Sequence, residues 1–198
     1  MPQRRVDLRR RLDALAYRQA GYFTAAQAKH IGYAYQAQKY HVDTGNWMRV
    51  DRGLFRLPDW PSSADDQYVR WALWSGLRAV VSHDSALRVH ELSDVDPASI
   101  HLTVPAGFRA EDPLVVAHRG VLDDDDVEHR QGWRVTTPLR TLADVAADEL
   151  SQEIIDAAVR DALERGLVSR RSLRRHAVDL SDRAALRLER ALAGAERS

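Results

Sequence analysis

The chain has 198 residues, enough for one large domain or two small ones with real hydrophobic cores. It contains no cysteine, which excludes disulfide frameworks, thiolate metal sites and cysteine nucleophiles. The formal net charge is zero, but residues 1–60 hold 11 Lys and Arg against 5 Asp and Glu, residues 61–150 hold 8 against 16, and residues 151–198 hold 10 against 8. Because local potential concentrates a polyanion at a surface, the basic first segment is the candidate for nucleic-acid contact.

The sequence predicts a cytoplasmic protein with no membrane partner. Its apolar runs are all far shorter than the ~20 residues that a membrane-spanning helix needs. The start of the chain, with Arg4 and Arg5, leads into an amphipathic helix pattern instead of the apolar core of a signal peptide.

The first 44 residues predict three helices. Apolar residues recur at helical spacing over 6–21. Thr24 is a natural N-cap for a second helix over 25–30, and Gly32 marks its end. A third helix is expected over 34–44, so the last two helices and their tight turn form a helix-turn-helix unit.

The next residues predict a wing. Residues 47–50 and 54–57 read as two short strands around a glycine-containing turn. Apolar residues alternate with Arg49 on the first strand and with Arg56 on the second, so that one face can pack on the helices while the other presents cations. Arg52 lies at the tip. Residues 1–60 are therefore predicted to be a winged helix-turn-helix domain that binds DNA.

In such a domain the third helix enters the major groove, where Gln can pair with adenine and Lys with guanine or phosphate. Gln36, Lys39 and Tyr40 rank highest as base-reading residues, and the arginines of the hairpin are expected to contact phosphate. The predicted DNA-binding residues are Thr24, Tyr35, Gln36, Gln38, Lys39, Tyr40, Arg49, Arg52 and Arg56. The alternative is a winged helix that is used for protein contacts.

Residues 61–198 predict a second, α+β domain after a Pro- and Ser-rich linker at 58–63. Its expected helices lie at 65–76, 82–92, 139–147, 151–165, 171–176 and 182–193, and its expected strands at 100–104, 114–118 and 133–136. The whole chain is therefore predicted to have an α+β fold, with a small mixed sheet and C-terminal helices in the second domain.

The second domain offers weak candidates for chemistry. The acidic run 123–126 holds oxygen ligands for a divalent ion, but four consecutive acids usually form a solvated loop. His83, Asp84 and Ser85 are the residue types of a hydrolytic triad, yet adjacent side chains point apart, and helix capping is the better interpretation. The remaining histidines are scattered singly and are interpreted as core or surface residues.

The lysines add an exclusion, because the chain has only Lys29 and Lys39. The second domain therefore has no phosphate-binding Gly-Lys motif, no Schiff-base lysine and no nuclease centre of two acids and a lysine. We assign no catalytic residue, no metal and no cofactor, and expect the protein not to be an enzyme.

Four segments resemble the AbiEi-type antitoxins of type IV toxin-antitoxin systems. They are GYFTAAQA at 21–28, WMRVDRGLFRLP at 47–58, VSHDSAL at 81–87 and TTPLRTLAD at 136–144. The resemblance implies a winged helix that binds operator repeats to repress its own operon. It also implies a C-terminal domain that counteracts a nucleotidyltransferase toxin.

The sequence thus predicts a transcriptional repressor and antitoxin whose partners are double-stranded operator DNA and a nucleotidyltransferase toxin. Three alternatives stay open: a stand-alone regulator without a toxin, a protein-binding module whose acidic middle segment docks a basic partner, and a metal-dependent nuclease that uses the acidic run 123–126.

Overall fold

The computed structural model describes residues 2–196, with side chains for residues 6–176 and 181–196. Contacts divide the chain into two compact units, Met1–Leu77 with His129–Trp133 and Arg78–Glu128 with Arg134–Ser198. The first unit extends beyond residue 60 and includes a short segment from the middle of the chain. Both units combine helices with a sheet, which confirms the predicted α+β fold.

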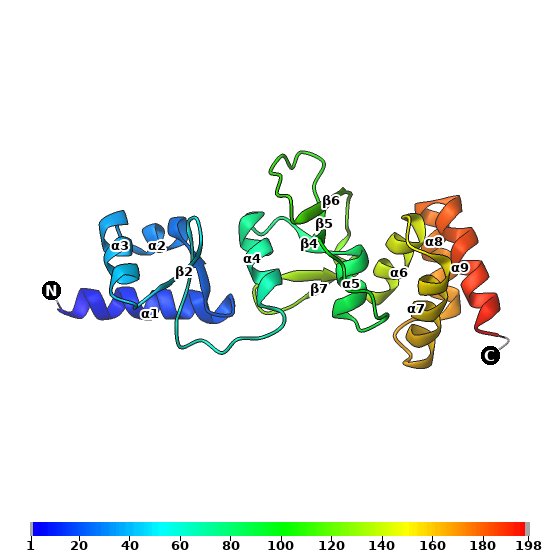
Figure 1. Ribbon diagram of the computed structural model, residues 1–198, viewed down its shortest axis with the longest axis horizontal. Helices are drawn as coiled ribbons and strands as arrows, with labels where there is room; N and C mark the ends of the chain where they lie inside the picture. The colour runs from blue at the N-terminus through cyan, green and yellow to red at the C-terminus, as the bar shows by residue number, and fades with distance from the viewer. Residues whose placement is uncertain (1, 197–198) are drawn as a thin grey trace. The chain divides into compact units, whose positions relative to one another are not determined.

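The first unit contains four helices and a three-stranded sheet (Figure 1). In chain order its elements are α1 (Pro2–Arg18), β1 (Tyr22–Thr24), α2 (Ala25–Ile31), α3 (Tyr35–Asp43), β2 (Met48–Asp51), β3 (Leu54–Arg56) and α4 (Asp66–Trp74). The sheet is antiparallel with the order β1-β3-β2. Strand β1 was not predicted, because this three-residue strand exists only where β3 offers it an edge.

Aromatic side chains form the core of this unit. Trp47 lies between helices and sheet, with its ring edge-on to Phe23 at 4.9 Å between centroids and stacked on His41 at 4.7 Å. Phe55 of β3 and Leu12 of α1 complete the buried set. The N-cap prediction for α2 is confirmed, because Thr24 and Gln27 form a capping box. This packing fixes α3 and the hairpin on one small core.

The second unit holds a five-stranded sheet in the order β6-β5-β4-β8-β7. Its strands are β4 (Val80–Val81), β5 (Ile100–Val104), β6 (Val115–Arg119), β7 (Val127–His129) and β8 (Arg134–Thr136). The 3-10 helix η1 (Asp124–Asp126) comes directly before β7. The α-helices are α5 (His83–Val89), α6 (Pro138–Ala147), α7 (Gln152–Glu164), α8 (Arg170–Leu180) and α9 (Asp182–Gly194). The two-residue strand β4 pairs antiparallel with β5 and parallel with β8. Its shortness explains why the sequence did not predict it.

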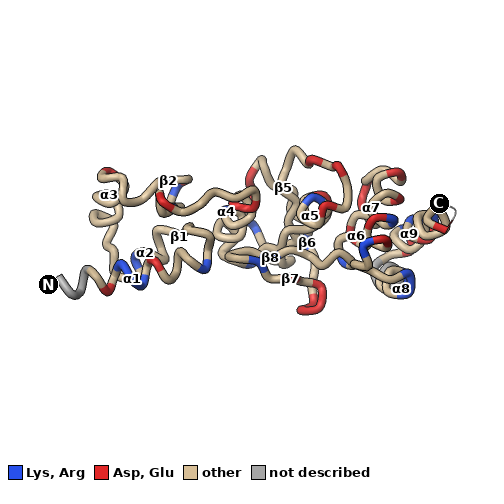
Figure 2. The backbone as a smooth tube through the Cα atoms, turned by 90° about the horizontal axis from the view of Figure 1, so that it is seen from below, with Lys and Arg blue, Asp and Glu red and all other residues tan. Residues whose placement is uncertain are grey.

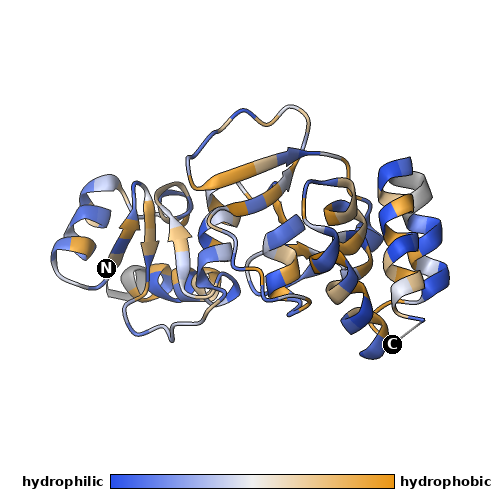
Figure 3. Cartoon of the chain, turned by 45° about the vertical axis from the view of Figure 1, so that its right-hand side comes forward, coloured by the Kyte–Doolittle hydropathy of each residue, from blue (hydrophilic) through white to orange (hydrophobic). Residues whose placement is uncertain are grey.

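A helical core of leucine, isoleucine, valine and alanine side chains supports this sheet. The central helix α6 contacts α5, α7, α8 and α9, and its Leu142 and Val145 are fully buried in the shared cluster. Figure 3 shows orange hydrophobic strands in the sheet and helices that alternate between hydrophobic and hydrophilic faces. Every helix in residues 2–196 is too short or too polar to cross a lipid bilayer.

Candidate functional site

Helix α3 presents a polar and aromatic face to solvent. Tyr35 and Tyr40 are each 61% exposed, and Gln36 and Lys39 are exposed beside them. Lys39 Nζ lies 2.6 Å from Asp43 Oδ2 one turn later, so part of its charge is neutralised on the helix itself. The four predicted residues Tyr35, Gln36, Lys39 and Tyr40 thus lie on one accessible face, which is a geometry that suits contact with a groove.

Gln38 is a correction to the predicted site. Its side chain is buried, with 3% exposed, and its amide donates to Ala25 O at 3.0 Å and to Tyr33 O at 2.9 Å. These bonds connect α3 to the start of α2 and to the turn between the two helices. The expected exposure of Gln38 is therefore wrong, because its side chain turns inward to donate to two backbone carbonyls at the corner between α2 and α3.

The hairpin that follows carries two exposed arginines. Arg49 on β2 and Arg52 in the turn are both exposed. Gly53, with φ of 71°, closes the turn in a conformation that favours glycine. Asp51 in the same turn accepts from Arg70 of α4 at 2.7 Å and from Arg52 N at 2.6 Å. The hairpin tip is thus held in place while both arginines stay exposed, and the guanidinium group of Arg49 lies over the Phe55 ring at 6.0 Å.

Arg56 is a second correction. It is 6% exposed, its Nη2 lies 2.8 Å from Asp66 Oδ2, and it donates to Pro61 O and Ser62 Oγ. Its guanidinium also lies over the ring of Tyr22 at 5.1 Å. Strict alternation predicted an outward Arg56, but β3 is the central strand and its second face is covered by the segment after the hairpin. Arg56 is therefore unavailable to a phosphate.

Thr24 lies at the N-terminus of α2, and its hydroxyl accepts from Gln27 N at 3.1 Å. Its backbone N–H donates to Gln27 Oε1 at 2.8 Å. The structure gives Thr24 a capping role, and a contact between this residue and DNA stays a prediction.

The acidic run of the second unit is only partly a solvated loop, visible in red beside β7 in Figure 2. Asp123, Asp124 and Asp125 are exposed, but Asp126 is 9% exposed. Asp126 Oδ2 accepts from Arg140 Nη1 at 2.8 Å. The prediction of a solvated loop is thus wrong for Asp126, whose carboxylate is engaged by an arginine.

Three histidines that lie far apart in the sequence meet in the second unit. His83 and His118 stack with centroids 3.5 Å apart, and His101 Nδ1 lies 3.1 Å from His118 Nε2. Burial, with the nearby His118 as the next cause, lowers the pKa of His83 to about 2; burial also lowers the pKa of His118. Both imidazoles are therefore neutral at pH 7. The prediction of scattered single histidines is wrong here.

The expected capping role of His83, Asp84 and Ser85 is also wrong, because α5 begins without a side-chain cap hydrogen bond. The hydroxyl of Ser85 accepts from His101 N at 2.9 Å, and the hydroxyl of Ser82 pairs with His83 Nδ1 at 2.9 Å. The only signal in the sequence was that His101 and His118 fall within predicted strands. Strand pairing places them on one face, because the register aligns Thr103 with His118 and His101 with Val116.

The comparisons with known proteins concern the first unit and the fold. Residues 10–58 match the model of a family described as transcriptional regulator, AbiEi antitoxin, which confirms the resemblance for this segment. The crystal structure of the RV2827C protein from Mycobacterium tuberculosis is similar, with a TM-score of 0.62 and 16% sequence identity over 93% of this chain and 75% of that chain. This likeness shows a shared fold. No curated protein matches the chain. The family match supports a role as a regulator or antitoxin.

Proposed function

Because residues 10–58 match a regulator and antitoxin family, we propose that the chain is a DNA-binding repressor of its own operon. In this proposal it acts in the cytoplasm, and the first unit is a winged helix-turn-helix that binds repeats in operator DNA. One observation carries the proposal: the exposed polar face of α3 lies on the same small core as a hairpin with two exposed arginines. The excess of positive charge in residues 1–60 supports it as well.

Each exposed side chain then has a role set by its chemistry. Gln36 pairs with an adenine edge, and Lys39 donates to guanine or to phosphate. Tyr35 and Tyr40 reach the backbone through their hydroxyls. Arg49 and Arg52 neutralise phosphates beside the groove, which positions α3 without reading sequence. The two buried side chains of the original prediction, Gln38 and Arg56, have no part in this proposal.

The test is a binding titration with the DNA upstream of the chain's own gene, measured by fluorescence anisotropy over a range of salt concentrations. Arg52→Ala weakens binding to every duplex and reduces the slope of log K against log salt by about one unit, because one phosphate contact is lost. Gln36→Ala weakens preference at a single base pair, at a cost of about 1–3 kcal/mol.

The matched control is Arg160→Ala, which removes the same charge from an exposed position on α7 of the second unit. It is expected to leave both affinity and salt slope unchanged. Equal slopes for the wild type, Arg52→Ala and the control contradict the proposed phosphate contact.

We further propose that the second unit supplies the antitoxin activity against a nucleotidyltransferase toxin. The matching family is described as an antitoxin, but its match lies in the first unit, and the assignment to the second unit depends on the antitoxin-like segments at 81–87 and 136–144. Co-expression with a nucleotidyltransferase encoded beside this gene tests it: the full chain restores growth, and Arg52→Ala, which is altered only in the first unit, restores it equally. Failure of the full chain to restore growth contradicts the antitoxin role and leaves the DNA-binding proposal to its own titration.

A further inference from the structure

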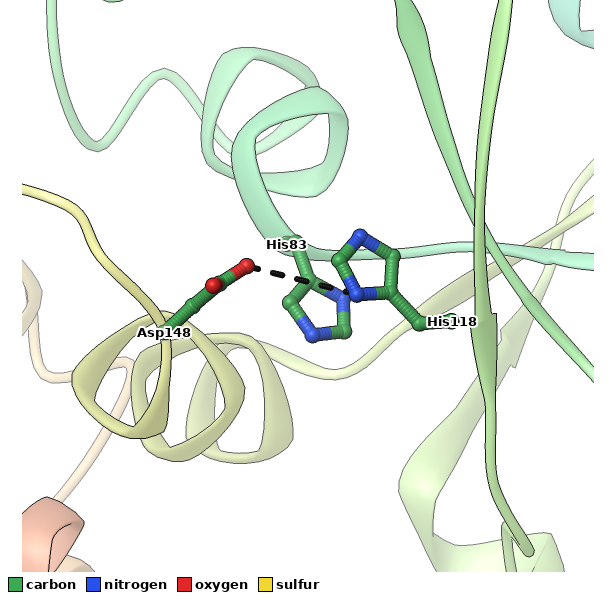
Figure 4. Close-up of side chains that lie close together, drawn as sticks. All are labelled: His83, His118 and Asp148. Atoms are coloured by element: carbon green, nitrogen blue, oxygen red, sulfur yellow. Dashed lines mark ion pairs between the residues drawn. The ribbon is translucent and has the colours of Figure 1, made fainter.

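The histidine cluster of the second unit brings together three side chains that ligate metal ions in other proteins. His83 is the first residue of α5, His118 lies on β6, and Asp148 follows the end of α6. Figure 4 shows the two rings face to face and the carboxylate of Asp148 directed at His118. Three side chains from α5, β6 and the end of α6 therefore meet at one point, although they lie far apart in the sequence.

The separations are close to those of a coordination shell. One ligand atom from each residue lies within 4.8 Å of the others, and His118 Nδ1 is 4.0 Å from Asp148 Oδ2. In a tetrahedral zinc site, bonds of about 2.0–2.1 Å place the ligand atoms about 3.4 Å apart. The His118–Asp148 separation exceeds this by about 0.6 Å and the widest separation in the set by up to about 1.4 Å, so that the side chains must rotate to close the shell.

Each of the three side chains also has its second polar atom held by a neighbour. His83 Nδ1 pairs with Ser82 Oγ at 2.9 Å. His118 Nε2 pairs with His101 Nδ1 at 3.1 Å, and Asp148 Oδ1 accepts from Glu149 N at 2.9 Å. Such outer bonds fix the tautomer and the direction of metal ligands. With protons on His83 Nδ1 and His118 Nε2, the remaining nitrogens present lone pairs.

The stacked rings require one adjustment on binding. The planes of His83 and His118 are within 10° of parallel, whereas an ion bound by both must lie in both ring planes. At least one ring therefore turns. His118 is the ring that turns, because it is half-buried whereas His83 is buried, and it turns about its Nε2 bond to His101, which is kept.

From this geometry we propose that His83, His118 and Asp148 form a binding site for one divalent ion of the Zn²⁺ class. Two neutral imidazoles and a carboxylate suit Zn²⁺ and its neighbours, whereas Mg²⁺ and Ca²⁺ prefer oxygen ligands alone. The fourth tetrahedral position is left to water or to a group from a partner. His101 is a positioning residue that holds His118, and this site is independent of the DNA-binding proposal.

The test titrates the full chain, first treated with a chelator, with Zn²⁺ in a calorimeter and with Co²⁺ by visible absorption. The wild type is expected to bind one equivalent, to show the intense visible bands of tetrahedral Co²⁺, and to melt at a higher temperature with Zn²⁺. His118→Ala and Asp148→Asn lose the bands and the thermal shift. His101→Ala binds about 10–100-fold more weakly, because only the orientation of His118 is lost.

The matched control is His30→Ala, which removes an exposed histidine of the first unit. It is expected to bind Zn²⁺ with the same affinity as the wild type. Asp148→Asn keeps the size and shape of a side chain that is 37% exposed, so its loss of binding is not a loss of folding. Binding that survives in both His118→Ala and Asp148→Asn, or a wild type that binds no Zn²⁺, overturns the proposal.

Discussion

Gln38 shows how a polar side chain on α3 serves the fold instead of a ligand. Its amide bridges Ala25 O and Tyr33 O, and thereby closes the corner between α2 and α3. Its neighbour Gln36 has the same chemistry but an exposed side chain. The two glutamines differ only in the side of the helix on which they lie, and this difference separates a structural role from a proposed DNA contact.

We therefore expect Gln38→Ala to lower the free energy of unfolding by about 1–3 kcal/mol, because two hydrogen bonds from a buried amide to backbone carbonyls are lost. Urea denaturation measures this change. Gln36→Ala is the matched control and is expected to change stability by no more than about 0.5 kcal/mol. A base preference altered in folded Gln38→Ala, with unchanged stability, contradicts the structural role.

Strand β3 determines which arginines of the hairpin are available. As the central strand it is buried along its whole length, and Arg56 at its end is turned toward Asp66 at the start of α4. Edge strand β2 leaves Arg49 exposed. The ion pair of Arg56 therefore ties the segment after the hairpin to the sheet of the first unit.

Breaking this pair from one side is expected to cost about 3–5 kcal/mol of unfolding free energy, because Arg56→Met leaves the largely buried carboxylate of Asp66 without its ion-pair partner. The double variant Arg56→Met/Asp66→Leu is expected to recover most of the loss. Chemical denaturation of the four proteins in the cycle measures the coupling. Equal losses in the single and double variants contradict the buried pair.

Helix α6 carries a buried carboxyl group whose titration affects stability. Burial raises the pKa of Asp144 from 3.8 to about 6, although Arg140 Nε lies only 2.8 Å from Asp144 Oδ1 and favours the charged form. Asp126 shares Arg140 and raises the pKa further, and His176 Nε2 lies 3.6 Å from Asp126. The contribution of protonated Asp144 to the free energy of unfolding is thus fully present below pH 3.8 and is lost as the pH rises through about 6.

Between pH 4 and pH 7 the free energy of unfolding of the wild type is accordingly expected to fall by up to about 3 kcal/mol relative to that of Asp144→Asn. Urea denaturation at a series of pH values measures the difference. Asp125→Asn, at an exposed position of the acidic run, is the control that follows the wild type. A constant difference between wild type and Asp144→Asn across this range contradicts the raised pKa.

The chain returns to its first unit at residues 129–133. Trp133 is buried against Tyr68 with ring centroids 4.7 Å apart, and Gln131 Nε2 donates to Tyr17 O at 2.5 Å. Gly132 adopts φ of 86°, and a Cβ added there would lie 2.8 Å from the Cα of Gln19. The first unit is therefore completed by residues that follow more than fifty positions later in the sequence.

Gly132→Ala is expected to destabilise the protein by about 1–3 kcal/mol, because alanine is strained at this φ and its Cβ meets backbone. Tryptophan fluorescence during denaturation follows the change. The matched control is Gly107→Ala, where an added Cβ has no neighbour within 4 Å among the described residues. Equal stability of the two variants contradicts the close approach.

The exposure of most of the predicted site residues could be read from the sequence, because helix periodicity separates an exposed face from a buried one, whereas their contact with DNA stays a prediction. Tyr35, Gln36, Lys39 and Tyr40 were found from the spacing of α3, and Arg49 and Arg52 from the hairpin pattern. Gln38 and Arg56 were misplaced because their burial depends on chain segments that pack over them. The histidine cluster was missed because no local pattern connects His83, His101 and His118.

Local patterns were sufficient for the mixed fold class, the three helices, the hairpin and the basic character of the first segment, because capping, turn glycines and apolar spacing act between near neighbours. The features that the sequence did not predict depend on packing between distant segments. It created β1 and β4, buried Gln38, Arg56 and Asp126, and gathered the histidines. The physical reason is that edges of strands and buried polar groups find their partners only when the folded backbone brings distant residues within hydrogen-bonding range.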